Sequence, residues 1–120
     1  MPAKNDALKG NLSRSSEITI TVTGRKSGRS ISIPIWFVFE DPTLYLLPVQ
    51  GSDTQWYKNM LDNQKIWIEA RGAEAESQAV PAADPKQVSC VVEKFRKKYG
   101  AGDVKKYYSK LDVAVVVQMR

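Results

Sequence analysis

The sequence contains no histidine and only one cysteine. Without histidine, Ser-His-Asp and Cys-His catalysis are impossible within the chain, and so are histidine-based zinc sites. One cysteine forms neither an intrachain disulfide nor a cysteine-rich metal site. The acidic residues are scattered and lack the spacing of a metal cage. No metal site is therefore expected, and any chemistry would depend on a cofactor.

Long apolar runs are also missing, and none approaches the ~20 residues of a membrane span. Residues 1–6 lack the apolar core of a signal peptide, so export is not expected. The single cysteine fits a reducing compartment, and together these features predict a cytoplasmic protein. Cys90 lies in the apolar stretch 88–92, which predicts a buried structural thiol.

The 120 residues are enough for one compact domain, 1–120, and too few for two. Hydrophobic residues make up 42% and charged residues 26%, as is ordinary for a soluble globular protein. Residues 1–14 are polar and predict a helical or flexible lead-in. The net charge of +5 favours an anionic partner without choosing among phosphate esters, nucleic acid, anionic membranes and acidic small molecules.

Six segments have the residue pattern of β-strands: 18–22, 31–39, 43–47, 65–69, 73–80 and 113–117. A hairpin through Arg71 and Gly72 is expected to join the fourth and fifth. Six short strands with few helices predict a mainly β fold with α insertions, either a small antiparallel barrel or a sandwich.

Three helices are expected beyond residue 50. Ser52 and Gln55 have the spacing of a capping box, which predicts a helix from there to about Leu61. Asp84 is a good N-cap before Pro85, and the helix that follows should run to Tyr99. A second short helix is expected over residues 103–109.

The most informative stretch is residues 23–29, TGRKSGR, between the first two predicted strands. Two glycines permit a tight turn, and three cations with Ser27 supply charge and hydrogen-bond donors at one spot. This arrangement suits a phosphate or another oxyanion, and it equally suits a solvated hairpin turn. Pro34 on the next strand gives up a ladder hydrogen bond, so it marks an edge, a bulge or the approach of another group.

Four segments in this order resemble the deazaflavin-dependent nitroreductase family: 21–29 (TVTGRKSGR), 33–37 (IPIWF), 44–47 (LYLL) and 56–60 (WYKNM). That family belongs to the split β-barrel group that contains the pyridoxamine-phosphate oxidases. The resemblance implies a six-stranded antiparallel split β-barrel with flanking short helices. It also implies an oxidoreductase that uses a reduced deazaflavin coenzyme to transfer a hydride to a quinone, a nitro compound or a similar small electron acceptor.

The resemblance also implies roles for individual residues. The cofactor's phosphate or acidic tail would be held by Arg25, Lys26, Ser27 and Arg29, with Trp56 and Asn59 bracing that end from the short helix. The ring would lie beside Pro34 and Trp36 and face the loop Pro48, Val49, Gln50 and Gly51. Tyr107 and Tyr108, near Tyr99, would act on the substrate, and a phenol there can orient an oxygen or donate a proton. For each tyrosine, simple amphipathic packing is the alternative.

One loop departs from the family pattern. Relatives often read ASKGG where this chain has residues 48–52, PVQGS, so a lysine is missing. Losing that positive contact makes FMN, with its shorter anionic tail, the alternative cofactor.

Two other functions stay open. One is a non-catalytic carrier of a flavin-like ligand on the same barrel; haem is less favoured because histidine, its commonest axial ligand, is missing. The other is a barrel that binds single-stranded nucleic acid, but the three tryptophans fall on different elements and form no basic-aromatic stripe. Nucleic acid is therefore not favoured as a partner. Related split barrels often pair, which makes a homodimer a possible assembly.

Overall fold

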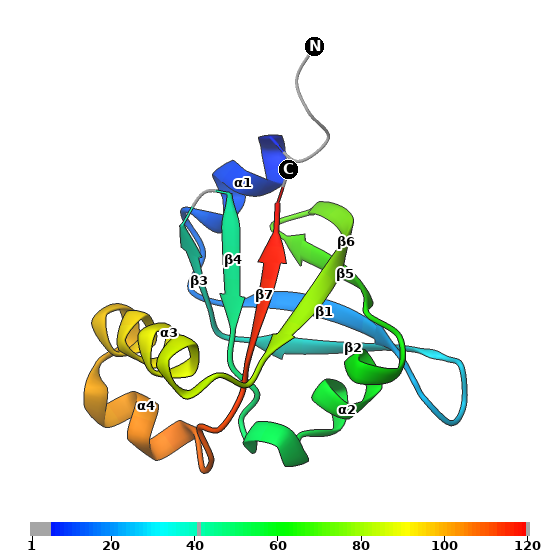
Figure 1. Ribbon diagram of the computed structural model, residues 1–120. Helices are drawn as coiled ribbons and strands as arrows, with labels where there is room; N and C mark the ends of the chain where they lie inside the picture. Colours follow the sequence, from blue (N-terminus) through cyan, green and yellow to red (C-terminus); the bar gives the residue numbers. More distant parts are fainter. Residues whose placement is uncertain (1–5, 41, 120) are drawn as a thin grey trace.

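The computed structural model describes residues 6–40 and 42–119 (Figure 1). The seven strands are β1 (Ile18–Thr23), β2 (Ser30–Ile35), β3 (Phe37–Glu40), β4 (Thr43–Leu46), β5 (Lys65–Ala70), β6 (Ala73–Ala82) and β7 (Ala114–Gln118). The helices are α1 (Asp6–Leu12), α2 (Gln55–Asp62), α3 (Pro85–Tyr99) and α4 (Ala101–Tyr107), and a 3-10 turn, η1, covers Gly51–Asp53. The prediction of a mainly β fold with short helices is confirmed.

The strands form one curled antiparallel sheet in the order β2-β1-β5-β6-β7-β4-β3. β6 turns the sheet on itself, because its first part pairs with β5 and its last four residues pair with β7. The second bend is at Trp36, between β2, which pairs with β1, and β3, which pairs with β4. In Figure 1, β1 and β2 run across the direction of β3, β4 and β7, so the sheet is a half-barrel.

The bend at Trp36 corrects the predicted strand count, which was six. The segment 31–39 was expected to be one strand because apolar residues alternate along it without a break. The alternation continues through the bend, since Ile35 and Phe37 on either side of Trp36 are both buried. Periodicity therefore gives no sign that the strand changes partners at this position. The result is two strands, β2 and β3, and seven in all.

Two clusters of buried side chains stabilise the fold. The first fills the half-barrel with side chains from the strands, α1 and α2, including Ile20, Phe37, Trp56 and Ile68. The second lies between the sheet and the pair α3–α4, which pack together at one side in Figure 1, and includes Val92, Phe95 and Tyr108.

The lead-in is helical where the structure describes it. Leu8 and Leu12 of α1 are fully buried in the first cluster, because their spacing of four residues places both on one helix face. Residues 1–5 of the segment expected to be a lead-in lie outside the described residues.

α3 begins and ends as its sequence predicts, but Cys90 does not lie where expected. The Asp84 side chain accepts from the Gln87 backbone N–H, Pro85 occupies the first turn, and Gly100 follows the last residue. Cys90 is exposed. The prediction of a buried thiol is wrong because Val88, Val91 and Val92 define the buried face of α3, and position 90 points away from it.

The hairpin and the proline also agree with the sequence. Arg71 and Gly72 both have positive φ, 52° and 89°, which is the backbone of a two-residue turn of type I′ between β5 and β6. Pro34 pairs with Thr19 of β1 and lies on β2, the first strand in the sheet order. Because β2 is hydrogen-bonded to β1 alone in this sheet order, the missing N–H of Pro34 interrupts no hydrogen bonds to a second neighbouring strand.

Candidate functional site

Arg25 joins the basic turn to α2. Its backbone N–H and its Nη1 both donate to Oδ1 of Asn59, at 3.1 and 2.7 Å, and its Nη2 donates to Oε1 of Gln55 at 2.9 Å. Asn59 is 5% exposed, so these bonds satisfy a buried polar group. The expectation that the basic turn and the helix with Trp56 and Asn59 meet in space is confirmed. Trp56 is buried in the half-barrel and fixes α2 from beneath.

The turn closes through its own backbone. The Gly24 N–H donates to the Arg29 carbonyl at 2.8 Å, and the Gly28 N–H donates to the Gly24 carbonyl at 2.9 Å. Gly28 has a φ of 71°, and a Cβ on Gly24 would lie 2.7 Å from the Ser27 hydroxyl. Gly28 is thus needed for its backbone angle and Gly24 for close approach. The Ser27 hydroxyl accepts from the Arg29 N–H at 3.2 Å, which holds it inside the turn.

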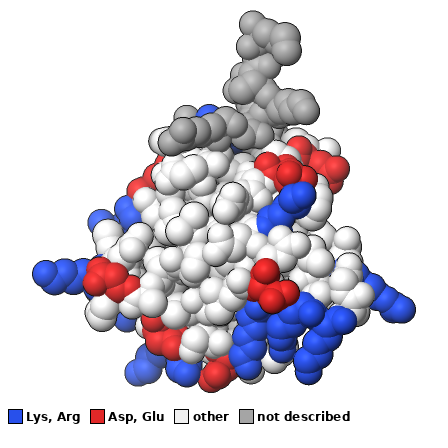
Figure 2. Space-filling model, turned by 45° about the vertical axis from the view of Figure 1, so that its right-hand side comes forward, with Lys and Arg blue, Asp and Glu red and all other residues white. Residues whose placement is uncertain are grey.

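Two cations of the turn remain for a ligand. Lys26 and Arg29 are exposed, and their side chains have no hydrogen-bond or ion-pair partner within residues 6–40 and 42–119. Figure 2 brings the side of the molecule that carries this turn forward and shows several Lys and Arg side chains gathered in the lower part of that face. The donor set suits an anion.

Trp36 lies at the bend between β2 and β3, under tyrosines from the C-terminal helices. Its ring stacks on Tyr99 with centroids 4.3 Å apart and planes 8° apart. Tyr107 meets the Trp36 ring edge-on at 4.6 Å, and Tyr108 lies 6.2 Å away. The structure therefore brings together the expected ring-binding tryptophan and the two expected substrate-side tyrosines.

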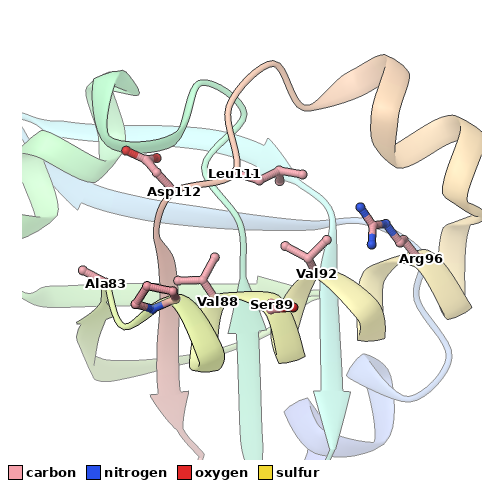
Figure 3. Close-up of a pocket in the computed structure, with 8 residues that line it drawn as sticks. Ala83, Val88, Ser89, Val92, Arg96, Leu111 and Asp112 are labelled. Carbon is pink, nitrogen blue, oxygen red and sulfur yellow. The ribbon is translucent and has the colours of Figure 1, made fainter.

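The two tyrosines face different pockets. A pocket of about 490 Å³ is lined by Trp36, Asp103, Lys106 and Tyr107. Tyr108 lines another, of about 640 Å³, together with Arg96 and Leu111. A third pocket of about 380 Å³ lies beyond Arg96, between α3 and the segment that leads to β7 (Figure 3). Tyr107 therefore lines the same pocket as Trp36, whereas Tyr108 lines a different one.

The basic turn and Trp36 lie at opposite ends of β2. An extended strand rises ~3.3 Å per residue, so Arg29 and Trp36 are about 23 Å apart. Between them, Ser30, Ser32 and Pro34 are exposed along the sheet edge. A ligand that touched both ends would have to be long and would lie along this strand.

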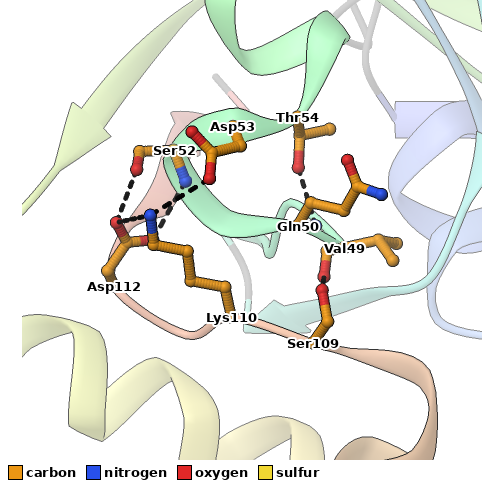
Figure 4. Close-up of polar contacts among 8 residues, drawn as sticks. All are labelled: Val49, Gln50, Ser52, Asp53, Thr54, Ser109, Lys110 and Asp112. Atoms are coloured by element: carbon orange, nitrogen blue, oxygen red, sulfur yellow. Dashed lines mark hydrogen bonds and ion pairs between the residues drawn. The ribbon is translucent and has the colours of Figure 1, made fainter.

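The loop after β4 is held by hydrogen bonds to other residues of the protein (Figure 4). The Gln50 N–H donates to Oγ1 of Thr54 at 2.8 Å, and the Gly51 N–H donates to the Pro48 carbonyl at 3.0 Å. The Val49 carbonyl accepts from the N–H of Ser109 at 2.9 Å. Two amides of the loop that the resemblance places opposite the cofactor ring, those of Gln50 and Gly51, thus already have acceptors.

Asp112 fastens the same loop to the segment before β7. Its carboxylate accepts from the Ser52 N–H at 2.9 Å and from the Ser52 hydroxyl at 2.6 Å, and the hydroxyl bond is the main reason that the pKa of Asp112 is lowered. Lys110 adds ion pairs to Asp53 at 3.2 Å and to Asp112 at 3.6 Å.

This tether overturns the predicted role of Ser52 as a helix cap. Residues 51–53 form the 3-10 turn, and α2 begins only at Gln55. The Ser52 hydroxyl is directed to a partner 60 residues away. A capping-box spacing carries no information about so distant an acceptor.

Tyr99 and Lys98 tie the end of α3 to β3. The Tyr99 hydroxyl lies 2.7 Å from the Ser16 carbonyl oxygen and 2.8 Å from that of Phe37, and it accepts from the Phe37 N–H at 3.1 Å. Burial raises the pKa of Tyr99 to about 12. The Lys98 Nζ donates to the Phe37 carbonyl at 2.8 Å and lies 3.6 Å from the centroid of its ring, and burial lowers its pKa to about 8.

Tyr99→Phe is expected to lower the free energy of unfolding by about 1–2 kcal/mol near pH 8, because the variant loses the one hydrogen that the hydroxyl donates to these carbonyls and the acceptor of the Phe37 N–H. The pKa of Tyr99 is higher in the folded chain than its ordinary 10.0, so its contribution is complete below pH 10 and is lost as the pH rises through 12. Urea unfolding of both proteins at pH 8, 10 and 11 measures the difference. A gap between the two proteins that widens above pH 10 would contradict this assignment.

The sheet forms a half-barrel that bends at Trp36 and within β6, and a basic turn and an aromatic cluster lie at the two ends of β2. This architecture defines the class of the protein as a split β-barrel. The family described as "Uncharacterized protein conserved in bacteria (DUF2255)" matches residues 10–118, and the chain belongs to that family. No curated protein matches the sequence.

Several solved structures share the fold. The structure of an F420-H2 dependent reductase (FDR-A) has a TM-score of 0.67 and 18% identity, over 86% of this chain and 94% of that one. The heme storage protein HutZ from Vibrio cholerae has a TM-score of 0.70 and 13% identity, over 99% and 92%. A structure described as a domain-swapped dimer has a TM-score of 0.68 and 16% identity, over 97% and 100%. At these identities the likeness shows the fold alone.

No cluster of three or more His, Cys, Asp or Glu residues suited to a metal ion occurs in residues 6–40 and 42–119. None of the helices in the same ranges has the length and apolar character needed to cross a membrane.

Proposed function

We propose that this chain is an oxidoreductase that binds a reduced deazaflavin coenzyme along β2 and uses it to reduce a small electron-poor acceptor. The observation that carries the proposal is the pair of unpartnered cations, Lys26 and Arg29, on a turn that Arg25 and Asn59 lock against α2. The fold neighbour named as an F420-H2 dependent reductase supports a deazaflavin as the class of cofactor.

Each end of β2 suits one end of such a ligand. Lys26 and Arg29 are positioned to neutralise its anionic tail, with Ser27 holding the turn in shape. The aromatic pocket of Trp36 and Tyr107 offers a flat apolar wall for its ring. Since about 23 Å of strand separates the two ends, the longer tail of the deazaflavin coenzyme suits the site better than the shorter tail of FMN, which is the alternative.

When bound, the reduced cofactor supplies a hydride, and the residues of this chain bind, orient and exclude water. Tyr107 is the tyrosine placed to orient an acceptor, because it lines the pocket with Trp36 and is 46% exposed. Its hydroxyl would donate a hydrogen bond to an acceptor oxygen, as in a quinone or nitro group. Tyr108 is buried behind it and faces another pocket, so it would support Tyr107 without touching the same acceptor.

Titration of the purified protein with the deazaflavin coenzyme and with FMN tests the proposal. We expect the deazaflavin to bind with a Kd below about 1 mM, the weak limit of specific affinity. Lys26→Gln and Arg29→Gln should each raise that Kd about tenfold, because each removes a charge-assisted bond. Arg71→Gln, which removes an exposed cation from the distant β5–β6 turn, is the control and should change the Kd less than about twofold. Binding of neither cofactor, or equal losses in all three variants, would refute the proposal.

A non-catalytic carrier is the second candidate, because the amides of Gln50 and Gly51 are already paired within the protein. The solved neighbour that stores heme shows that a binding function occurs on this fold. A steady-state assay with reduced cofactor and menadione separates the two: turnover supports the oxidoreductase, and tight binding without turnover supports the carrier. The neighbour described as a domain-swapped dimer supports a homodimer as the assembly, which sedimentation of the purified protein would measure.

A further inference from the structure

A pocket away from β2 lies between one face of α3 and the segment that joins α4 to β7. Its volume is about 380 Å³, and its lining consists of Ala83, Pro85, Val88, Ser89, Val92, Arg96, Leu111 and Asp112. Val88, Val92 and Arg96 are four residues apart along α3, so they share one helix face. Figure 3 shows these three side chains directed from α3 toward Leu111 and Asp112 on the opposite wall.

A second pocket, of about 640 Å³, lies next to the first. The two share Arg96 and Leu111, so they adjoin at these residues. The second is lined in addition by Glu93, Ala101, Val104, Lys105 and Tyr108. We call these two adjoining pockets together the α3 groove. The first has apolar walls from Val88, Val92 and Leu111, and the second carries the cations Arg96 and Lys105. Volumes of this size are typical of small-molecule sites.

Hydrogen-bond donors line the second pocket, and one of them, Arg96, also borders the first. Arg96 donates to Glu93 through Nη1, and its other N–H groups have no acceptor within the described ranges. Lys105 likewise has no ion-pair or hydrogen-bond partner in residues 6–40 and 42–119. The Tyr108 hydroxyl makes no hydrogen bond to any described residue. Solvent reaches it, since no buried side-chain oxygen within residues 6–40 and 42–119 lacks a partner, so it is free to donate to a ligand in the second pocket, which Tyr108 lines.

The acidic groups that face the groove are already engaged. Glu93 is paired with Arg96 on the same helix, and Asp112 is held by Ser52 and Lys110. Burial raises the pKa of Tyr108, so its hydroxyl keeps its proton and is a donor at neutral pH. Hydrogen-bond donors without acceptors beside an apolar wall complement a ligand that has an anionic end and a hydrocarbon body.

We propose that the α3 groove binds a small amphipathic carboxylate, with its charged end at Arg96, Lys105 and Tyr108 and its alkyl or aryl body against Val88, Val92 and Leu111. This site is separate from the cofactor site proposed along β2, since none of the groove's lining residues belongs to the basic turn or to the pocket of Trp36 and Tyr107.

Titration of 15N-labelled protein with octanoate, followed by NMR, tests the site. We expect octanoate to shift the backbone amides of Val88, Val92 and Leu111 with a Kd in the millimolar range or below, and octan-1-ol to bind more weakly. Arg96→Gln should raise the octanoate Kd about tenfold through loss of a charge-assisted bond. Lys97→Gln is the matched control: it removes the same charge from the next residue, which does not line the groove, and should change the Kd less than about twofold.

Three results would overturn the proposal. The first is no saturable shift of these amides at several millimolar octanoate. The second is octan-1-ol binding as tightly as octanoate, which would make the site apolar only. The third is an equal loss in Arg96→Gln and Lys97→Gln, which would reduce the effect to the general positive charge of the α3 C-terminus.

Discussion

Replacing Gly51 with alanine is expected to lower the free energy of unfolding by about 2–4 kcal/mol, because two separate costs arise at this position. Gly51 has a φ of 56°, a left-handed backbone that alanine adopts with strain. A Cβ there would also lie 2.1 Å from Oδ1 of Asp112 and 3.0 Å from the Lys110 carbonyl oxygen. The variant therefore has to break the Ser52–Asp112 tether or distort the loop. Urea unfolding measures the loss.

Two other glycines separate these costs. Gly28 has a φ of 71° and open space around it, so Gly28→Ala should show the backbone cost alone, about 1–2 kcal/mol. Gly102 lies inside α4, also in open space, and Gly102→Ala should raise stability by about 0.5–1 kcal/mol. If Gly51→Ala were no worse than Gly28→Ala, the close approach of Asp112 to the loop would be refuted.

Asn59→Ala is expected to lower the free energy of unfolding by about 2–3 kcal/mol, since Oδ1 of Asn59 is the acceptor for both the backbone N–H and the guanidinium of Arg25. The basic turn would lose its attachment to α2, and the Kd for the deazaflavin coenzyme should rise tenfold or more. Thermal or urea unfolding gives the stability, and fluorescence titration gives the affinity.

Gln55→Ala and Asn59→Asp provide the controls. Gln55 accepts from the same guanidinium but is exposed, so its removal should cost less than about 0.5 kcal/mol. Asn59→Asp keeps an acceptor for Arg25 but adds a negative charge beside the turn, so it should restore stability and still weaken anion binding. Full cofactor affinity in Asn59→Asp would show that the anion does not bind at the turn.

Local chemistry made much of the fold predictable. The two ends of α3 were predictable from Asp84, Pro85 and Gly100, because a helix cap acts on backbone groups only a few residues away. The turn between β5 and β6 was predictable for a similar reason, because Arg71 and Gly72 themselves determine its backbone conformation. The bend at Trp36 was missed because alternation of apolar residues continues through it. Cys90 was misplaced because an apolar run on a helix includes positions that face solvent.

The site was predictable only where one short segment carried the signal. The proximity of the turn 23–29 to the helix that carries Asn59 could be predicted, because the two motifs occur in the same order as in the family that the sequence resembles. The tether from Ser52 to Asp112 joins residues 60 positions apart, and no local pattern marks it. The same holds for the α3 groove, whose walls come from α3, from α4 and from residues 108–112.

One NMR titration tests the central claim, that the basic turn and Trp36 form two ends of one site. Adding the deazaflavin coenzyme to 15N-labelled protein should shift the amides of Lys26 to Arg29 and the Trp36 indole N–H together, with one Kd. Shifts confined to one end, or shifts of neither while cofactor binds elsewhere, would contradict the account.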